Sequence, residues 1–443
     1  MKYRGCNVLN TDAPELELFI NSTVVKNQID KQFCVEDAVA LIPDYMSDIS
    51  LYAKAVEVYL ANYSDDYVAS PFEHTDRILD IIHAHDMLDN PKAKKLKALP
   101  DLCIIELLKH YFDLCMLDSS FDESELIRSK CRLAVYNPKT GLYTFNSSDI
   151  QGLIYSFEPR LTDKSMKDLM SKMANTLSIP MYSVTNDMNL VALNNCIYNY
   201  KTDEQYKYSI DYKYTYKLPV DFNENATSVV NVLNSKGQAV DFDVEKWFES
   251  LASDEDIRYL LWQMVGAVIR VGMPWNKAFL LYSPVGENGK GTLCTMLRNI
   301  MGSKNCSSMA ISDFSDSVLM SMLADKAAVI CDENNVGMFI DQSANFKSVV
   351  THDSFMVNPK YQAPYTATFR GAIVECINER PRLKDKSNSI YRRLLIIPMT
   401  TNFTGKADPD IKGIYMHDKG VLEYIVKKVL KDMPKYYELT SPE

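Results

Sequence analysis

One stretch of this chain, residues 277–301, constrains the fold more than any other. The apolar run KAFLLYS predicts a buried strand, and KGTLCTMLRNIM predicts a helix with apolar residues at helical spacing. The loop between them contains Gly286 and Gly289. Glycines in such a loop let an anion approach the backbone N–H groups at the N-terminus of the helix. The stretch therefore predicts an α/β domain with a phosphate-binding loop.

The loop SPVGENGKGT departs in two places from the usual pattern G-x-x-x-x-G-K-[ST]. Pro284 stands where the pattern has its first glycine, and Gly291 stands where it has a hydroxyl, with Thr292 one place later. Asn288 is expected to tolerate a left-handed backbone, and Lys290 is expected to reach the β- and γ-phosphates of a nucleotide. Taken alone, the loop is explained as well by an ordinary glycine-rich turn.

Two acidic residues follow the next apolar run. KAAVICDENN at 326–335 predicts a strand that ends in Asp332 and Glu333. At a phosphate site these carboxylates can divide the work, with one binding Mg²⁺ through water and the other polarising the attacking water. The alternative interpretation of the pair, taken alone, is a solvated strand end.

Two further strands end or begin in polar side chains. GAIVECIN at 371–378 ends in Asn378, whose amide can hold a water near a γ-phosphate. YRRLLIIPM places Arg392 and Arg393 at the start of a fourth apolar strand, either as surface charges or to meet the phosphate of a neighbouring subunit. Because side chains alternate along a strand, only one of the two arginines is expected to face that neighbour. Four such motifs in this order favour a nucleotide site over four unrelated loops.

With these motifs, residues 276–402 resemble the ATPase core of superfamily 3 DNA helicases, in the branch of poxvirus-type and phage or plasmid primase–helicases. Those proteins have a loop similar to G-x-G-x-N-G-K-[SG]-T, here PVGENGKGT. The resemblance implies a RecA-like/AAA+-type P-loop ATPase core, with ATP and Mg²⁺ as cofactors. It implies that the nucleotide is bound by Gly286, Glu287, Asn288, Gly289, Lys290, Gly291 and Thr292. Thr292 and Asp332 would hold the metal ion, and the catalytic set would be Lys290, Asp332, Glu333, Asn378 and Arg393.

The resemblance also implies a DNA-binding hairpin. Members of the family have an extra block between the second and third motifs, here FKSVVTHDSFMVNPKYQAPYTATF at 346–369. It would end in a β-hairpin whose tip, Lys360 and Tyr361, projects into the pore of a ring. A lysine there would meet phosphate, and a tyrosine ring would stack on sugar or base.

The function implied is ATP-dependent translocation along single-stranded DNA by a homo-hexameric ring, in which Arg393 completes the site of the next subunit. The chain would be the replicative helicase of a phage or mobile element in a bacterial cytoplasm. One alternative is a primase–helicase with polymerising activity, for which Asp241 and Asp243 are the available acid pair, although Asp243 is better explained as a helix cap. The other is a non-catalytic nucleotide-binding ring or loader.

Charge is distributed unevenly along the 443 residues. The whole chain has a net charge of −10. Residues 1–125 have 11 Lys or Arg against 23 Asp or Glu, a net of −12, whereas residues 276–401 have 14 against 11, a net of +3. DNA binding needs local positive charge and is therefore expected in the C-terminal third. The acidic N-terminal region is a candidate surface for a primase or origin-binding protein.

The pattern along the chain predicts several parts. Helical spacing dominates 1–125, including 102–117, a hairpin is expected at 131–146, and the tyrosine-rich segment 206–222 predicts another hairpin or strand pair. The run at 259–273 is too short to span a membrane and is expected to be a buried helix. Ten scattered cysteines without a CxxC pair favour reduced thiols over zinc. The expected parts are an acidic helical domain at 1–125, a mixed α/β accessory domain at 126–235, a helical collar at 236–275, the ATPase core at 276–402, and a C-terminal helical segment at 403–443.

Overall fold

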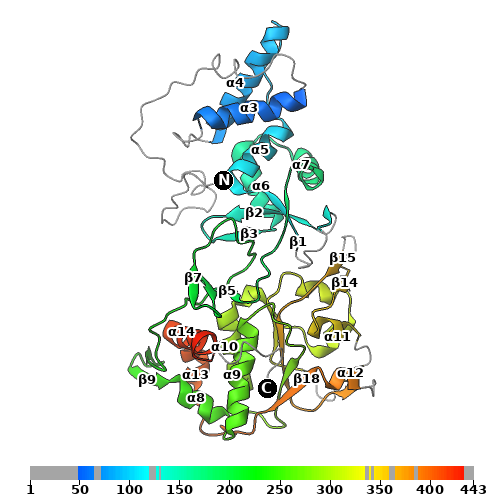
Figure 1. Cartoon of the computed structure of the whole chain (residues 1–443). Helices are drawn as coiled ribbons and strands as arrows, with labels where there is room; N and C mark the ends of the chain where they lie inside the picture. Colours follow the sequence, from blue (N-terminus) through cyan, green and yellow to red (C-terminus); the bar gives the residue numbers. More distant parts are fainter. Residues whose placement is uncertain are drawn as a thin grey trace. The chain divides into compact units, whose positions relative to one another are not determined.

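The computed structural model describes residues 48–63, 71–118, 126–128, 131–334, 339–340, 344–358, 365–383 and 388–433. The chain divides into two compact units (Figure 1). Among the described residues, unit 1 contains those up to 182 together with 209–213, and unit 2 contains 183–208 and those from 214 onward. The five-part division expected from the sequence stays a prediction.

Unit 1 combines helices with an antiparallel sheet. Its helices are α3 (Asp48–Tyr63), α4 (Pro71–Asp89), α5 (Asp101–Phe112), α6 (Ser147–Phe157) and α7 (Asp163–Asn175). Its strands are β1 (Cys115–Asp118), β2 (Arg132–Asn137), β3 (Leu142–Thr144) and β4 (Met181–Ser183, whose last residue falls in unit 2), in the order β3-β2-β1-β4. The predicted hairpin at 131–146 is confirmed, since β2 and β3 pair antiparallel. The predicted helix at 102–117 is too long, because Asp113 takes a left-handed φ of 44° and a strand follows.

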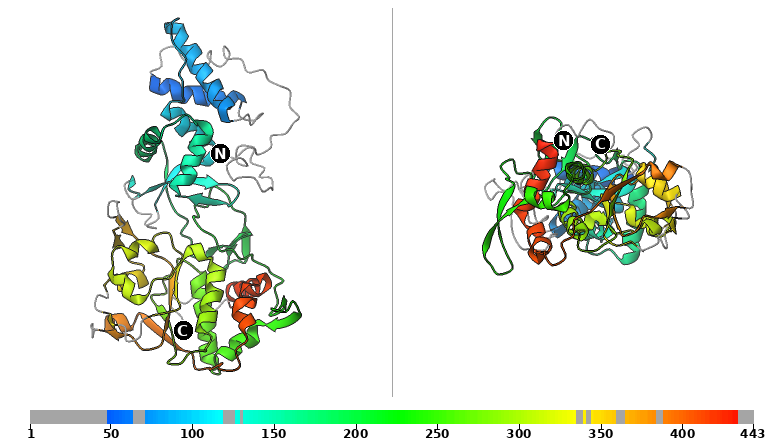
Figure 2. Two further views of the ribbon diagram at one scale, coloured as in Figure 1. Left: turned by 180° about the vertical axis from the view of Figure 1, so that it is seen from behind. Right: turned by 90° about the horizontal axis from the view of Figure 1, so that it is seen from below.

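Unit 2 begins with small antiparallel elements. They are the meander β5 (Leu190–Ala192), β6 (Ile197–Asn199) and β7 (Glu204–Tyr206) and the hairpin β8 (Val229–Leu233) with β9 (Ala239–Asp243). In both views of Figure 2, the hairpin β8–β9 extends outward next to the red C-terminal helices. Val230 of this hairpin reaches Gly420 of that helical region.

The second hairpin or strand pair predicted at 206–222 is not formed, because β7 ends at Tyr206 and no strand follows before Val229. Residues 209–213 belong to unit 1, so the chain leaves unit 2 and returns within this segment. Its tyrosines pack and bond singly instead of pairing strands: the Tyr208 hydroxyl, for example, donates to the Leu193 carbonyl at 2.5 Å. The alternation of tyrosines therefore reflects separate packing contacts.

Two helices connect these elements to the main sheet. Asp243 caps α8 (Val244–Leu251), since its carboxylate accepts from the N–H groups of Glu245 and Lys246, as the sequence predicts. Most of the run expected as a buried helix, 259–273, lies in α9 (Glu255–Ile269), which is buried from Leu261 to its end, whereas residues 270–273 follow the helix. No helix within the described ranges is long and apolar enough to cross a membrane.

A five-stranded parallel sheet forms the centre of unit 2. The strands are β10 (Ala278–Tyr282), β11 (Cys306–Ser307), β12 (Ala328–Cys331), β16 (Ala372–Ile377) and β18 (Leu394–Pro398). Their order is β11-β12-β16-β10-β18, and every neighbouring pair is parallel. The chain therefore has a mixed α/β fold with a parallel sheet, as expected.

Both faces of this sheet are covered, which is usual for parallel sheets and explains the continuous apolar strands. Phe279 and Leu281 point into a core shared with α9 and α10 (Lys290–Met301). Ala278 and Leu280 point into a second core on the other face, shared with α11 (Ala344–Val350). Figure 1 shows α9 and α10 in green and α11 in yellow.

The remaining elements of unit 2 are short. They are η2 (Ser303–Asn305), η3 (Ile311–Ser315), η4 (Leu319–Leu323), β13 (Phe339–Ile340), β14 (Phe355–Val357), β15 (Tyr365–Ala367), β17 (Arg382–Leu383), α12 (Asn388–Tyr391), α13 (Pro409–Gly413), η5 (Tyr415–His417), α14 (Lys419–Lys427) and the π-helical turn η6 (Lys428–Asp432).

Candidate functional site

The polar segments that the sequence predicts at the ends of its strands lie at one edge of the parallel sheet. Tyr282, the last residue of β10, pairs with Ile377 of β16 and with Pro398 of β18, so these strands end at the same level. Cys331, the last residue of β12, pairs with Glu375 of β16. The phosphate-loop candidate, the acidic pair and Asn378 therefore leave the sheet at the same edge. In open α/β sheets, ligands bind at this carboxyl edge.

The loop before α10 is shaped by one of its own side chains and by the C-terminal segment. The buried Asn288 amide donates to the Val285 carbonyl, and its oxygen accepts from the Lys290 N–H at 3.3 Å. The Phe403 N–H donates to the Glu287 carbonyl at 2.8 Å. Glu287, with φ of 53°, and not Asn288, takes the left-handed backbone, so that detail of the prediction is wrong. Asn288 serves through its side chain instead.

Gly289 is required where the loop enters α10. Its φ is 87°, and a Cβ at this position would lie 2.5 Å from the Leu251 side chain. Gly289 caps α10 without any side-chain hydrogen bond. The N–H groups of the first turn have no partners inside a helix, so those of Gly291 and Thr292 are available to an anion.

Lys290 links the ends of the two central strands. Its ammonium donates to the Ser283 carbonyl at 3.1 Å, to the Ile377 carbonyl at 3.2 Å and to the Asn378 side-chain oxygen at 2.8 Å. Burial lowers the pKa of Lys290 from its usual value. The structure thus brings two of the predicted residues, Lys290 and Asn378, into direct contact.

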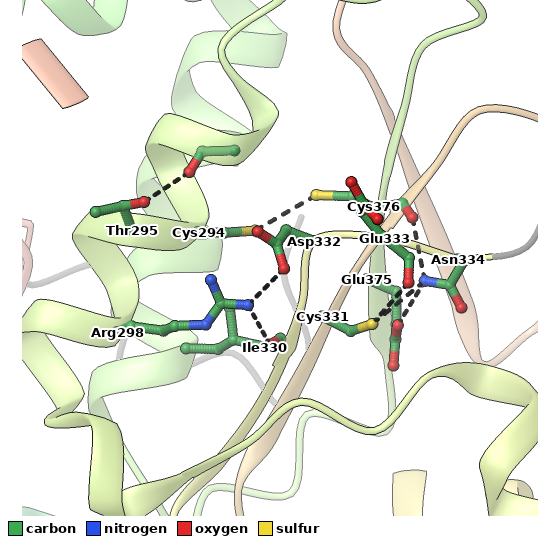
Figure 3. A network of polar contacts seen from close by, with 11 residues as sticks. Cys294, Thr295, Arg298, Ile330, Cys331, Asp332, Glu333, Asn334, Glu375 and Cys376 are labelled. Atoms are coloured by element: carbon green, nitrogen blue, oxygen red, sulfur yellow. Dashed lines mark hydrogen bonds and ion pairs between the residues drawn. The ribbon is translucent and has the colours of Figure 1, made fainter. Parts of the chain in front are cut away.

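The acidic pair has a different set of partners. Asp332 binds Arg298 of α10 at 2.8 Å, and this hydrogen bond lowers the pKa of the Asp332 carboxyl. Arg298 also donates to the Ile330 carbonyl at 2.9 Å (Figure 3). The Glu333 side chain is exposed, and its backbone carbonyl accepts from the Cys331 thiol at 3.1 Å. Both carboxylates lie at the expected edge, but neither has a hydrogen bond to Lys290 among the contacts of the described residues.

A cation that the sequence did not indicate lies beside the first turn of α10. The ammonium of Lys412, in α13, would be 3.2 Å from a Cβ placed on Gly291. Its charge also lowers the pKa of Asp332, after the larger effect of Arg298. The position that usually has a hydroxyl therefore faces a lysine here. Thr292, the next residue, is partly buried in the same turn.

The two arginines lie at the opposite edge of the sheet. Arg392 and Arg393 form a turn just before β18, so the expectation that strand alternation separates them is wrong. The Arg393 carbonyl accepts from Ala278 N–H at 2.7 Å, at the start of β10, and its guanidinium donates to the Ser389 carbonyl at 2.6 Å. Arg392 is exposed.

The hairpin predicted within 346–369 is present at its base. β14 and β15 pair antiparallel, from Phe355 with Ala367 to Val357 with Tyr365. Lys360 and Tyr361, the predicted DNA-binding tip, lie outside the described residues. Their role stays a prediction.

The donors at this edge fit a nucleotide with a bound Mg²⁺. The Ser283 hydroxyl is fully buried beside Lys290 and has no hydrogen-bond partner among the described residues, so a ligand could satisfy it. Where the chain is described, no three His, Cys, Asp or Glu side chains cluster closely enough to hold a metal by themselves. Proteins usually bind Mg²⁺ through one or two carboxylates together with substrate phosphates, and Asp332 is the carboxylate expected to serve here. Eight cysteines in this part of the chain are free.

Comparisons with known proteins relate two segments to families. Residues 130–258 match a family described as D5 N terminal like, and residues 281–393 match a family of unknown function, DUF5906. Each match covers less than half of the chain. The first supports a relation to phage-type primase–helicases, and the second spans the candidate site. No curated protein matches the chain.

Among solved structures, the chain is similar to three structures of the NrS-1 C-terminal region. "The A form apo structure of NrS-1 C terminal region-CTR" is 11% identical with a TM-score of 0.40, over 70% of this chain and 69% of that one. An apo structure of the same region has 11% identity and a TM-score of 0.43, over 76% and 71%. Another A form has 12% identity and a TM-score of 0.43, over 77% and 75%.

Proposed function

We propose that unit 2 is a RecA-like/AAA+-type P-loop ATPase core of the superfamily 3 helicase type, which binds ATP with Mg²⁺ at the carboxyl edge of its parallel sheet. The observation that supports this most is the position of the Lys290 ammonium. It lies between the ends of β10 and β16, beside Asn378 and at the uncapped start of α10. A cation and free N–H groups at one helix N-terminus make a site for phosphate.

The side chains at this edge match the needs of phosphoryl transfer, which depends on positioning and on neutralising charge. Lys290 would exchange its protein oxygens for those of the β- and γ-phosphates. Asp332 and Thr292 would hold Mg²⁺, whose chemistry is to neutralise phosphate oxygens. Glu333 would orient the attacking water, and Asn378 would fix a water near the γ-phosphate. In this arrangement Arg298 holds Asp332 at the strand end.

Lys412 would add a second cation to the same site. Its ammonium lies next to Gly291, in the first turn of α10. A phosphate bound there would lie between the helix terminus and the ammonium. The C-terminal segment would thus help to close the site, as the hydrogen bond from Phe403 to the loop also suggests.

The position of Arg393 favours action on a neighbouring subunit. Arg393 precedes β18, whereas the Lys290 loop follows β10, and these strands are parallel and paired along five residues. At about 3.3 Å per residue, the two positions lie roughly 16 Å apart across the sheet. Arg393 is therefore remote from the site of its own subunit. In a homo-hexameric ring the same side chain would reach the nucleotide of the next subunit.

The activity proposed is ATP-driven translocation on single-stranded DNA, as in the replicative helicase of a phage or mobile element. Support comes from the D5 match over 130–258, from the motif order and from the paired strands β14 and β15 below the predicted DNA-binding tip. A primase or origin-binding protein remains the proposed partner of the acidic N-terminal region. Asp241 and Asp243, the acid pair considered for polymerisation, are engaged with Asn231 and with the cap of α8.

Steady-state ATP hydrolysis with and without single-stranded DNA tests this proposal. The wild type should hydrolyse ATP faster with DNA, and Lys290→Ala should hydrolyse none. Lys326→Ala is a matched control, since Lys326 also donates to a backbone carbonyl, that of Lys304, but at the start of β12. Wild-type hydrolysis by Lys290→Ala would contradict the proposal. Nucleotide binding without hydrolysis by the wild type would favour a non-catalytic ring.

A further inference from the structure

Glu375 is an acidic residue in the middle of an otherwise apolar, fully buried strand. All six residues of β16 are buried, and Glu375 has no exposed surface. Burying a carboxyl group is unfavourable unless hydrogen bonds compensate for the lost water. Neither the ATPase roles proposed above nor the packing of the sheet requires an acid here. Its contacts therefore indicate what it does.

The carboxyl of Glu375 holds the side chain that follows the acidic pair. Asn334 donates from its amide nitrogen to Glu375 Oε2 at 2.8 Å and to the Cys376 carbonyl at 3.1 Å (Figure 3). The amide oxygen of Asn334 accepts from the Ile311 N–H at 3.1 Å. Both ends of this side chain are thus engaged, one by β16 and the other by the start of η3.

We infer that Glu375 and Asn334 are a positioning pair, which fixes the Asp332–Glu333 turn against β16 so that the Glu333 carboxylate keeps its place relative to Asn378. This inference rests on the proposed ATPase function. β16 ends in Ile377, and Asn378 follows directly, so the strand that holds Asn334 also places Asn378. The single strand β16 would then set the distance between Glu333, which would orient the attacking water, and Asn378, which would fix a water near the γ-phosphate.

The exposed position of Glu333 makes such an anchor necessary. An exposed glutamate at a strand end has many side-chain rotamers. An ordered backbone limits the positions that the Glu333 carboxylate can take, so less conformational entropy is lost when it orients the attacking water. The backbone carbonyl of Glu333 accepts from the Cys331 thiol, which is a weak donor. The amide of Asn334, bound at both ends, ties the residue after Glu333 to β16 and η3, while the Arg298–Asp332 ion pair ties the residue before it to α10.

Asn334→Asp tests the pair in the full-length chain. It keeps the shape and the acceptor for Ile311, but it removes the donor and puts a second carboxyl group against Glu375. We expect ATP turnover to fall by roughly 100-fold, the scale of a displaced catalytic group, while affinity for a non-hydrolysable ATP analogue stays at the wild-type value. Glu375→Gln keeps an oxygen for Asn334 and should retain near-wild-type turnover.

Asn223→Asp is the matched control, because Asn223 donates to the buried Glu423 carboxylate at 2.7 Å in the same unit but far from the acidic turn in sequence. It should lower thermal stability and leave turnover unchanged. Wild-type turnover in folded Asn334→Asp, or an equal loss in Asn223→Asp, would overturn the inference. Loss of analogue binding in step with turnover would also overturn it. A wild type without ATP hydrolysis would instead refute the proposed function, and with it the inference.

Discussion

At the scale of single residues, the cations of the candidate site differ in how firmly they are held. Lys290 is buried and bonded to three oxygens, whereas Lys412 is exposed and reaches the first turn of α10 from a distant part of the chain. A bound phosphate would have to replace the protein partners of Lys290, but it could recruit Lys412 directly. We therefore expect the two lysines to make separate contributions to nucleotide binding.

Replacing Lys412 tests its contribution to ATP binding. Lys412→Ala should weaken ATP binding by about tenfold or more, because a hydrogen bond to a charged group contributes about 1.5–3 kcal/mol. Lys419→Ala is the control: this lysine of the same C-terminal segment is 73% exposed and pairs with Asp221, as a surface ion pair of small effect. Isothermal titration with ATP measures both. Unchanged affinity in Lys412→Ala would place its ammonium outside the site.

The buried carboxyl of Glu375 predicts a dependence of stability on pH. Burial raises the pKa of Glu375 well above its usual value, while the unfolded chain ionises it normally. A raised folded-state pKa gives stability that is fully present below the unfolded value and is lost as pH rises toward the folded one, by about 1.4 kcal/mol per pH unit. The free energy of unfolding of the wild type should therefore fall relative to Glu375→Gln above about pH 4.5.

Urea unfolding of both proteins between pH 5 and about pH 8 measures this difference. Cys331, Cys294 and Asp313, the titratable groups near Glu375, are present in both proteins, so the difference between the two proteins reports on Glu375 itself. Burial also raises the pKa of the Cys331 thiol to about 12, above this pH window. A difference that does not change with pH would mean that Glu375 ionises as readily in the folded protein as in the unfolded chain.

At the scale of elements, the proposed function assigns DNA contact to the hairpin β14–β15 and nucleotide chemistry to the carboxyl edge of the parallel sheet. Lys360→Ala should lose DNA-stimulated ATPase and keep basal hydrolysis, because the predicted tip would touch the strand and not the nucleotide. Tyr361→Ala should weaken single-stranded DNA binding by roughly tenfold or more, since stacking of a base on an aromatic ring is worth about 1–3 kcal/mol. Met356→Ala, an exposed residue of β14, is the control. DNA stimulation that survives both tip changes would place the DNA site elsewhere.

The sequence predicted the elements of the site better than the contacts between them. KAFLLYS and KGTLCTMLRNIM become β10 and α10 almost to the residue, because each has one strong period and clear ends. Because β10 and β16 are parallel neighbours, both end at the same edge of the sheet, and Asn378 therefore lies next to Lys290. The tyrosine-rich segment 206–222 was predicted wrongly, since ring packing can produce the same alternation as a strand.

Other features of the site depend on tertiary contacts that no local pattern contains. Lys412 reaches Gly291 from α13, and Glu375 reaches Asn334 from a neighbouring strand. The sequence periodicity around Lys412 and around Glu375 does not indicate a partner for either side chain. Glu375 did give a signal, because an acid within a run of apolar residues requires a buried partner. That signal indicates that a buried partner exists, but it does not identify which residue the partner is.

At the scale of the whole molecule, the proposed mechanism requires more than one copy of the chain. The Lys290 loop and Arg393 lie at opposite edges of one sheet, so one subunit would not complete a site from both. In the proposed ring, the carboxyl edge of one subunit would lie near the opposite edge of the next. A trans arginine can contribute about 10³–10⁵ in turnover, far more than a surface charge.

Mixing two inactive variants tests this central claim most directly. Lys290→Ala and Arg393→Ala should each hydrolyse ATP hardly at all, the second while still binding it, and Arg392→Ala should remain active. In mixed rings, some interfaces join an intact Lys290 to an intact Arg393 of the neighbour, so part of the ATPase activity should return. No recovery, in mixtures shown by native mass to be co-assembled, would contradict a site shared between subunits.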